Sequence, residues 1–577
     1  MKVIEMFSKI LRNCICAILM LLSFQVGFSQ EDENIGTEVI NVVKPYTPTI
    51  SDAFKVKENP EVNDDVDLKK KDVNYTTLSV PVASTFTPSK GKAAVVEKQA
   101  PQKLYNNFAS LAVGNYLNVL AELYATIPLN RSDNFTVGLN HHSTQGEIEE
   151  VQLDDKFYDT NLNVMYSKSE RDVSYQIGGV FKHQLYNWYG TSYELTDLQR
   201  TNIDASHTYF TGGIDGDVTI NKSLFTGGKI KYRRFWDTYE ASENRVVVTP
   251  EFEFEVADYL INLKTTVDYL GGEFNALDPG QKYSILNAGI HPSYQYLQDD
   301  LSVSIGVEAM LNVDSEHSNT EFYVYPKITA SYNLMNNTVI AFGGLEGGLQ
   351  QNSYEQFVDE NKYLAPNLVI APTHNQFDAY LGLKGKLSGA FNYSIKGRYL
   401  VEDTKAMFTM NPVNDVDIVT ENFDKANTFS VIYDDVNTLQ FSGKLSAQIS
   451  KNYTLGVSAT YSNYSSDELE EVLNLPEFNA TLFGDFKVSD KVFGGLNLFY
   501  VGERIDKLQS TTVLVNPKTV ALEGYFDVNA HVGYHITNRF TAFLRGNNLA
   551  NQSYQRWQSY PVQQLQVLGG LTYKFDF

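Results

Sequence analysis

Cysteine is nearly absent from this chain of 577 residues, which holds only Cys14 and Cys16. Both lie ahead of residue 30, so a chain that loses its first segment on export retains no thiol. This excludes disulfide frameworks, thiolate zinc sites and cysteine nucleophiles from the mature protein. Positive charge is scarce too: 46 lysines and arginines stand against 69 aspartates and glutamates, a formal net charge of −23. A protein of this sign repels a phosphate backbone, so we expect no nucleic-acid partner.

Long hydrophobic runs are also missing. Past the N-terminus no stretch reaches the roughly 18 apolar residues that a membrane-spanning helix requires. The apolar run at residues 15–24 is shorter, follows three basic residues, and is followed by Gly27 and Ser29. This order of basic, apolar and small residues predicts a secretory signal peptide over residues 1–29, in preference to a helical anchor. We therefore expect an exported, acidic protein.

What the sequence does hold is aromatic residues and a two-residue period. Aromatics make up 13% of the chain, too much for a mainly disordered protein. From about residue 105 onward, apolar residues alternate with polar or small ones in segments of about 10 to 15 residues, the length of a tilted strand that crosses a bilayer. Tyr453, Leu455 and Val457, for example, fall on one face, and the residues between them are threonine and glycine. Because backbone polar groups in hydrocarbon must be satisfied within the protein, such strands predict a closed barrel.

Short polar turns allow the strands to be counted. They recur near residues 131, 171, 222, 258, 299, 336, 389, 451, 490 and 538. These turns divide residues 105–577 into hairpins, and they predict an all-β, transmembrane antiparallel β-barrel of about 22 strands. A barrel of about 20 strands stays open as an alternative, because the first hairpin and residues 404–436 have a weaker pattern. A soluble β-propeller would show more even spacing, and we do not favour it.

Longer polar segments lie between the short turns. They cover residues 142–156, 351–374, 404–436, 463–475, 503–521 and 550–562. Outer-membrane barrels have short turns on the periplasmic side and longer loops outside. We therefore expect the long segments to face the outside and both ends of the chain to face the periplasm.

The end of the chain carries a pattern of its own. Leu571, Tyr573, Phe575 and Phe577 share one face of the expected last strand, and Phe577 is the terminal residue. A terminal outward aromatic residue resembles the assembly signal of outer-membrane β-barrels. The resemblance implies that these four side chains take part in barrel assembly.

The stretch before the last strand carries a family resemblance. Asn548, Leu549, Asn551 and Tyr554 have the Asn-Leu-x-Asn-x-x-Tyr spacing that is common after the penultimate strand of TonB-dependent receptors. With its expected 22 strands, the barrel region resembles that family. The resemblance implies a location in the outer membrane of a Gram-negative bacterium and a role in admitting a solute.

A segment near the mature N-terminus is similar to the TonB box, by which such receptors offer a strand to an energy-transducing partner. It consists of Thr37, Glu38, Val39, Ile40, Asn41, Val42 and Val43. Strand addition relies on backbone hydrogen bonds, so the side-chain pattern is loose. An ordinary docking strand for another periplasmic protein is the alternative.

The chain departs from the family between this segment and the barrel. Receptors of the family carry a folded plug domain there, for which residues 44–104 are too few. These residues hold six prolines and a charged run at residues 65–72, so we expect a mostly irregular periplasmic tail over residues 30–104. A barrel of 22 strands has a wide lumen that is normally plugged. Three occupants stay open: this tail, a second protein, or the long outer loops.

Candidate catalytic or metal-binding side chains do not form a recognisable site in the sequence. His531 and His535 would both point into the lumen, but four residues along a strand separate them by roughly 13 Å, too far to share a metal ion. Acidic clusters at residues 147–155 and 467–471 offer the oxygen ligands of calcium. They lack the spacing of a dedicated site, so we interpret them as solvated charge. The sequence has no phosphate-binding loop and no Gly-x-Ser-x-Gly elbow. We expect no metal, no cofactor and no enzymatic activity.

Two functions are consistent with these features. The first is an outer-membrane receptor or transporter that admits a solute, with a TonB-type energy transducer as its partner. The second is a plugless scaffold barrel in a larger export or assembly complex, docked by its tail and with its lumen filled by another protein. In both, the outer wall contacts membrane lipid. No motif fixes the loop conformations that would select a substrate.

Overall fold

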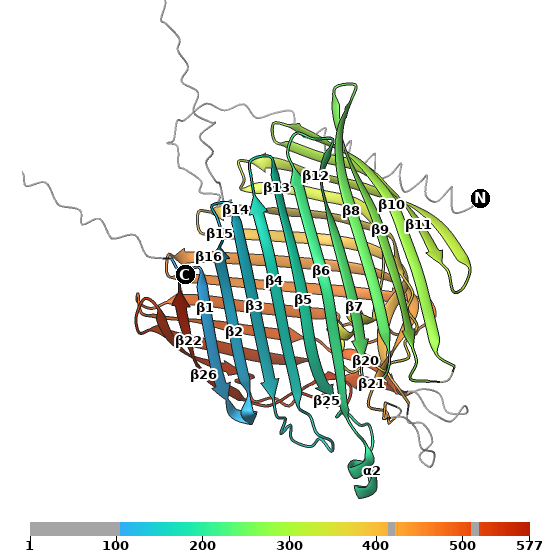
Figure 1. The fold of residues 1–577 in the computed structure, drawn as a ribbon, viewed down its shortest axis with the longest axis vertical. Helices are drawn as coiled ribbons and strands as arrows, with labels where there is room; N and C mark the ends of the chain where they lie inside the picture. Colours follow the sequence, from blue (N-terminus) through green and yellow to red (C-terminus); the bar gives the residue numbers. More distant parts are fainter. Residues whose placement is uncertain (1–103, 278, 413–421, 424, 509–517) are drawn as a thin grey trace, which may run out of the picture. The chain divides into compact units, whose positions relative to one another are not determined.

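The structure, a computed structural model, describes residues 104–577 except residue 278 and residues 413–421, 424 and 509–517 (Figure 1). The described part belongs to one unit that spans residues 98–577. The expected signal peptide, the TonB-box-like residues and the tail up to residue 103 lie outside the described residues, so those interpretations stay predictions.

The barrel wall is one closed sheet of 22 antiparallel strands. Each strand pairs with the next along the chain, and the last strand closes the ring on the first, from Asn107↔Phe575 to Gly114↔Leu568. A closed ring lets backbone groups at membrane depth pair within the protein, as hydrocarbon requires. The expected barrel of 22 strands is confirmed, and the alternative of 20 is wrong. The strands are β1 (Asn107–Gly114), β2 (Val119–Pro128), β3 (Asp133–Thr144), β4 (Phe157–Ser169), β5 (Val173–Asn187), β6 (Ser206–Ile220), β7 (Phe225–Asp237), β8 (Ser242–Val256), β9 (Tyr259–Phe274), β10 (Gln281–Gln298), β11 (Leu301–Asp314), β12 (Asn319–Met335), β13 (Val339–Gln350), β14 (Thr373–Ser388), β15 (Phe391–Met410), β16 (Phe429–Ser450), β17 (Tyr453–Ser466), β18 (Phe478–Lys487), β19 (Val492–Val501), β22 (Tyr525–His535), β23 (Phe540–Asn547) and β26 (Gln566–Phe575).

The outer face of the wall is apolar, as the two-residue period predicts. On β17, Tyr453, Leu455 and Val457 point outward and are 40–46% exposed. Large apolar side chains at this exposure would promote association in water, whereas acyl chains solvate them well. Successive residues of a strand point to opposite faces, so Thr454 and Ser458 of the same strand face the bore.

The inner face of the wall is polar, and ion pairs cross-brace it over β6–β15. Each pair joins neighbouring strands diagonally, so that opposite charges lie within reach of each other. The pairs are Asp215–Arg233 (2.7 Å), Asp268–Arg245 (2.6 Å), Glu308–Lys327 (3.1 Å) and Asp378–Arg398 (2.6 Å). A wettable bore is therefore enclosed by an apolar exterior.

Short turns join the strands at one end of the barrel, at the positions that the sequence predicted. In the turn between β12 and β13, Asn336 and Asn337 both have positive φ, at 39° and 64°. Asparagine tolerates this conformation better than most residues, and two such residues in a row suit a tight hairpin. The start of β1 and the end of β26 lie at this end too, because Asn107 pairs with Phe575.

Longer connections occupy the opposite end and contain short elements of their own. These are η2 (Asn115–Leu117), α2 (Asp197–Asn202), α3 (Tyr354–Glu360), the hairpin of β20 (Arg504–Leu508) and β21 (Lys518–Leu522), and the hairpin of β24 (Gln555–Trp557) and β25 (Tyr560–Pro561). None of the helices in the described residues is long and apolar enough to cross a membrane.

One long loop is shorter than the sequence predicted. The expected loop 404–436 is reduced to residues 411–428, because β15 extends to Met410 and β16 begins at Phe429. Both of these residues are fully buried. Their apolar side chains belong to an interior packing layer at the long-loop end of the barrel. The sequence pattern does not separate this layer from the lipid-facing surface.

Candidate functional site

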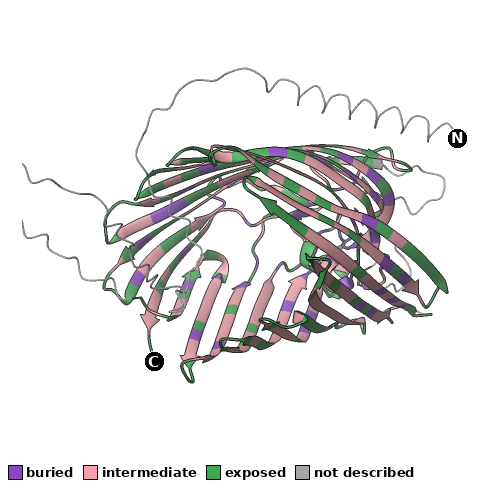
Figure 2. Cartoon of the chain, turned by 90° about the horizontal axis from the view of Figure 1, so that it is seen from above, coloured by how far each residue is buried: buried purple, intermediate pink, exposed green. Residues whose placement is uncertain are grey.

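Residues of the protein's own long loops occupy the end of the bore opposite the short turns. A continuous cluster of buried apolar side chains, here named the loop core, joins the inner wall to these loops. Its main members on the wall are Tyr209, Phe235, Leu270, Phe274, Tyr283, Phe408, Met410, Phe429 and Val431, and those in the loops are Leu153, Tyr189, Leu195, Tyr354, Phe357, Val358, Leu364, Leu368, Ile370, Trp557 and Tyr560. In the view from above, loop segments cross the opening of the ring, and some are coloured as buried (Figure 2). The long loops are therefore one occupant of the bore.

Helix α3 is fastened to the wall by a buried carboxylate. Glu243, at the start of β8, is 2% exposed and accepts hydrogen bonds from the main-chain N–H groups of Tyr354 (2.6 Å) and Glu355 (3.3 Å). It also accepts a hydrogen bond from the Tyr283 hydroxyl (2.8 Å). The first N–H groups of a helix have no partner within the helix, and the positive end of the helix dipole favours a negative charge. Glu243 therefore fixes the N-terminus of α3 to the wall through these hydrogen bonds.

Tyrosine hydroxyls tie the loops to the wall and to one another. Each donates to a main-chain carbonyl in a segment far away in the sequence, so each bond fixes the path of a loop that has no regular structure there. The bonds run from Tyr209 to Lys362 (2.9 Å), from Tyr189 to Pro561 (2.9 Å) and from Tyr560 to Asn427. Burial raises the pKa values of the loop residues Tyr189 and Tyr560, so both stay protonated donors.

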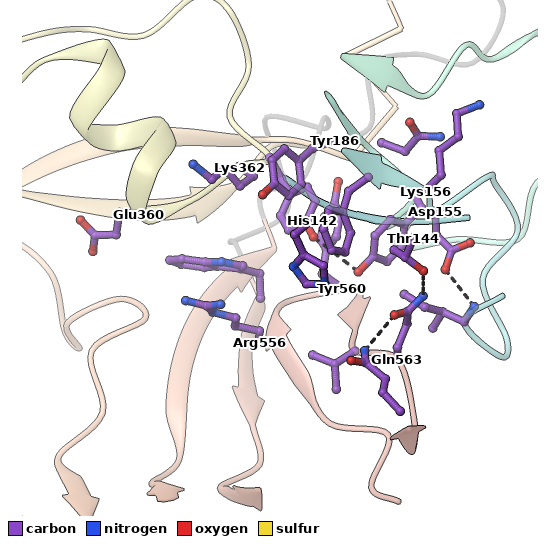
Figure 3. A pocket seen from close by; sticks show the side chains of 18 of the residues that line it. His142, Thr144, Asp155, Lys156, Tyr186, Glu360, Lys362, Arg556, Tyr560 and Gln563 are labelled. Atoms are coloured by element: carbon purple, nitrogen blue, oxygen red, sulfur yellow. Dashed lines mark hydrogen bonds between the residues drawn. The ribbon is translucent and has the colours of Figure 1, made fainter. Parts of the chain in front are cut away.

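A pocket of about 330 Å³ remains between the loop core and the inner wall (Figure 3). On the wall side, Phe157 and Tyr186 stack with ring centroids 5.5 Å apart, and His142 contacts Phe157 edge-on. On the loop side, Tyr363 and Tyr560 stack at 3.7 Å. The volume is at the lower end of the range for small-molecule sites, and aromatic walls with a few polar groups are typical of such sites.

Three cations border the pocket, and two of them are neutralised within the protein. Lys156 pairs with Asp154 (2.8 Å), and Lys362 pairs with Asp359 (3.1 Å). The side chain of Arg556 is exposed and forms no ion pair or hydrogen bond with any other residue that the structure describes. Its guanidinium is therefore available to an anionic or carbonyl group of a ligand.

A buried acceptor in the pocket wall also lacks a partner. Asn187 is 3% exposed, and its side-chain nitrogen donates to the Asp154 carbonyl (2.8 Å). Its Oδ1 accepts no hydrogen bond from the described part of the chain. An unpaired buried acceptor costs about 1–3 kcal/mol. The pocket therefore fits a ligand that combines an apolar or ring face with an acceptor for Arg556.

The polar residues that the sequence singled out lie mostly away from this pocket. His531 and His535 are on β22, and neither lines the pocket. Among residues 104–577, outside the gaps named above, no group of three or more His, Cys, Asp or Glu side chains is arranged to hold a metal ion. Asp155 does line the pocket, and it is buried instead of solvated. It accepts the N–H groups of Glu147 (3.0 Å) and Ile148 (2.8 Å), and burial raises its pKa.

The C-terminal residues lie on the strand that closes the barrel. Leu571 of β26 points outward and is 54% exposed, and Phe577 follows the end of that strand with 73% exposure. Tyr573 and Phe575 stack on each other at 5.8 Å. The assembly role of these residues stays a prediction.

Sequence reasoning missed the loop core, although one signal of it is present in a segment that was expected to be a polar loop. Tyr354, Phe357 and Val358 follow the i, i+3, i+4 spacing of a short amphipathic helix. The serine before them is a good N-cap residue. Glu243 carries no such signal, because nothing in the sequence of β8 distinguishes it from the other charged residues of the wall strands.

Solved structures of outer-membrane receptors share this fold. The chain resembles the ferripyoverdine receptor of Pseudomonas aeruginosa (TM-score 0.60, 14% identity, 83% of this chain and 73% of that chain covered). It also resembles the ferric-catecholate import receptor Fiu of E. coli K12 (0.58, 12%, 82% and 82%) and the FrpB iron transporter of Neisseria meningitidis (0.62, 9%, 82% and 82%). No family model matches the sequence, and neither does any curated protein.

At this level of identity the likeness shows the fold alone. The structure has the closed 22-stranded barrel of TonB-dependent receptors, so the resemblance inferred from the sequence is confirmed for the fold. The proteins compared are described as a receptor and a transporter, which is a statement about those proteins.

Proposed function

We propose that the protein is a receptor in the outer membrane of a Gram-negative bacterium that captures a solute in the pocket and admits it through the bore. The observation that carries this proposal is that the loops at the outer end of the bore also form one side of the pocket (Figure 3). A solute seated there contacts the fixed wall at Tyr186 and the loops at Tyr363 and Tyr560. Binding can therefore bias the packing of the loops that lie in its path.

Passage of the solute requires the loop core to rearrange. The core is fastened by Glu243 and by tyrosine bonds between loops, so it is a discrete packed state. Beyond it the solute meets a polar wall with paired charges, along which a hydrophilic molecule can move without desolvation. In this proposal a TonB-type transducer in the periplasm engages residues 37–43 and supplies the energy. The fold likeness and the residue pattern of that segment support this partner.

The test combines uptake with conductance. Cells that lack the gene should lose the uptake of one nutrient, and the full chain should restore it. A Tyr363→Ala and Tyr560→Ala double variant should not restore it, whereas Leu198→Ala in α2, outside the pocket, should. In planar bilayers, replacement of residues 353–371 by a short Gly-Ser linker should raise the conductance above that of the unmodified chain.

Two results would contradict this proposal. If loss of the gene changes no uptake, and neither form of the protein conducts, the bore is not a transport route. If gentle detergent extraction and mass spectrometry recover stoichiometric partners as well, the scaffold function is supported instead.

A further inference from the structure

A second hollow lies between the loop 467–477 and the chain that follows β19. Its volume is about 640 Å³. Tyr464, Val472, Leu475 and Ile505 line it and pack on a buried apolar cluster beneath. The hollow therefore has an apolar floor on a rigid base, and it is separate from the solute pocket.

The rim of this hollow is acidic. Four carboxylates line it: Glu470, Glu471, Glu477 and Glu503. None of them forms an ion pair or a side-chain hydrogen bond with the residues that the structure describes. We name this hollow the acidic groove. Unpaired charges of one sign around a low-dielectric floor attract a cationic ligand and repel an anionic one.

An open strand edge runs along the groove. β17 continues to Ser466 and stays paired there with β16, but its ladder to β18 stops at Tyr461. One more bond follows, from the Ser462 N–H to the Glu477 carbonyl (2.7 Å). Residues 464–466 line the groove, and within the described ranges no further backbone bond is made on this edge. An unpaired edge of this kind is a template for a strand from another chain.

A buried hydrogen-bond donor in a residue of the groove wall, Arg504, has no acceptor among the described residues. Arg504 is 6% exposed, and its two terminal nitrogens donate to the main-chain carbonyls of Gln555 (2.7 Å) and Arg556. Its Nε has no hydrogen-bond partner in the part of the chain that is described. Such a donor is costly to bury unpaired.

We propose that the acidic groove binds a basic peptide segment of an extracellular partner by strand addition to the open edge of β17. Alternate side chains of an added strand point to opposite faces, so lysine or arginine can face the carboxylates while apolar residues cover the floor. Residues 413–421 and 509–517, which the structure does not describe, contain no lysine or arginine and so do not match the acidic rim. The N-terminal residues do contain lysines, but we expect them in the periplasm. The proposed occupant is therefore another molecule.

The test uses the full chain in nanodiscs of zwitterionic lipid. The probe is a labelled, end-capped heptapeptide that alternates lysine with valine, and its binding is followed by fluorescence anisotropy. A second peptide replaces lysine with glutamate, and two others carry N-methyl groups on alternate residues, one for each register. The double variant E470Q/E471Q removes two groove charges. Its matched control is E147Q/E150Q, which removes two exposed carboxylates from the loop 145–156, outside the groove.

We expect the lysine peptide to bind, and to bind less tightly as salt is raised. E470Q/E471Q should weaken binding about fivefold, and E147Q/E150Q should leave it unchanged. One of the N-methylated peptides should bind at least about tenfold more weakly, because it cannot pair with the edge. Equal binding of the glutamate peptide, or unchanged binding to E470Q/E471Q, would overturn the assignment of the groove. Full binding of both N-methylated peptides would overturn strand addition. If calcium binds to the groove in place of any peptide, the proposed occupant is wrong.

Discussion

Removal of the Glu243 carboxylate should release α3 from the wall of the barrel. In Glu243→Ala, the N–H groups of Tyr354 and Glu355 and the Tyr283 hydroxyl lose their acceptor in a buried place. A buried donor that loses its only acceptor costs about 1–3 kcal/mol. Water that enters the vacated space replaces some of these hydrogen bonds and so recovers part of the lost free energy. We therefore expect local opening of α3 to become easier by about 3 kcal/mol, which corresponds to somewhat more than a hundredfold.

Amide hydrogen exchange in nanodiscs measures this opening directly. Peptides that cover residues 354–360 should exchange at least about a hundredfold faster in Glu243→Ala, while those from β17 should not change. Glu253→Ala is the matched control, because Glu253 is exposed on the same face of the same strand and its carboxylate has no partner among the described residues. Unchanged exchange of α3 in a correctly folded Glu243→Ala barrel would refute the reasoning. Apolar packing alone would then hold the helix.

Other predictions concern four further places in the chain. Burial raises the pKa of Asp506 in β20 to about 6, above its ordinary value of 3.8. The packing of the β20–β21 hairpin should therefore be strongest below pH 3.8 and weaken as the pH rises through 6. Asp506→Asn should abolish this dependence. At pH 7 it should raise the free energy of local opening of β20 by up to about 3 kcal/mol, which is measured as slower hydrogen exchange. Tyr560→Ala removes the stack on Tyr363 and should cost the loop core about 3 kcal/mol, seen as faster proteolysis of the loop that holds α3. Val39→Pro should abolish nutrient uptake but leave solute binding to the purified protein unchanged, since proline cannot donate a strand hydrogen bond; uptake at the normal rate would show that strand addition at residues 37–43 is not needed. Deletion of Phe577 should lower the yield of folded, heat-modifiable barrel in the membrane several-fold, and an unchanged yield would exclude an assembly role.

The barrel could be predicted from the sequence because its rules are local. Alternation over about ten residues places each side chain on the lipid or the bore face, and turn residues such as Asn336 and Asn337 mark where strands reverse. Each of these signals lies within one hairpin. The count of strands and the position of the short turns were therefore accessible without any tertiary information.

The loop core could not be predicted, because its contacts join segments far apart in the sequence. Glu243 and Tyr354 are separated by 111 positions, and Tyr560 and Asn427 by 133. A buried carboxylate and a surface carboxylate look the same in a sequence, and only the partner decides which is which. The interpretation of Asp155 as solvated charge is wrong for this reason, because its partners are backbone groups of a loop whose path no motif specifies.

The packing of the outer loops limits how this protein can diverge. Surface loops of most membrane proteins tolerate insertions and substitutions freely, and such drift helps a cell to escape phages and antibodies. Here Tyr354, Phe357 and Tyr560 are interior residues that happen to belong to loops, so a change at any of them would disturb a folded core. Among descendants of this chain, drift should concentrate around α2, where Leu198 is 72% exposed, and should spare the loop that follows β13.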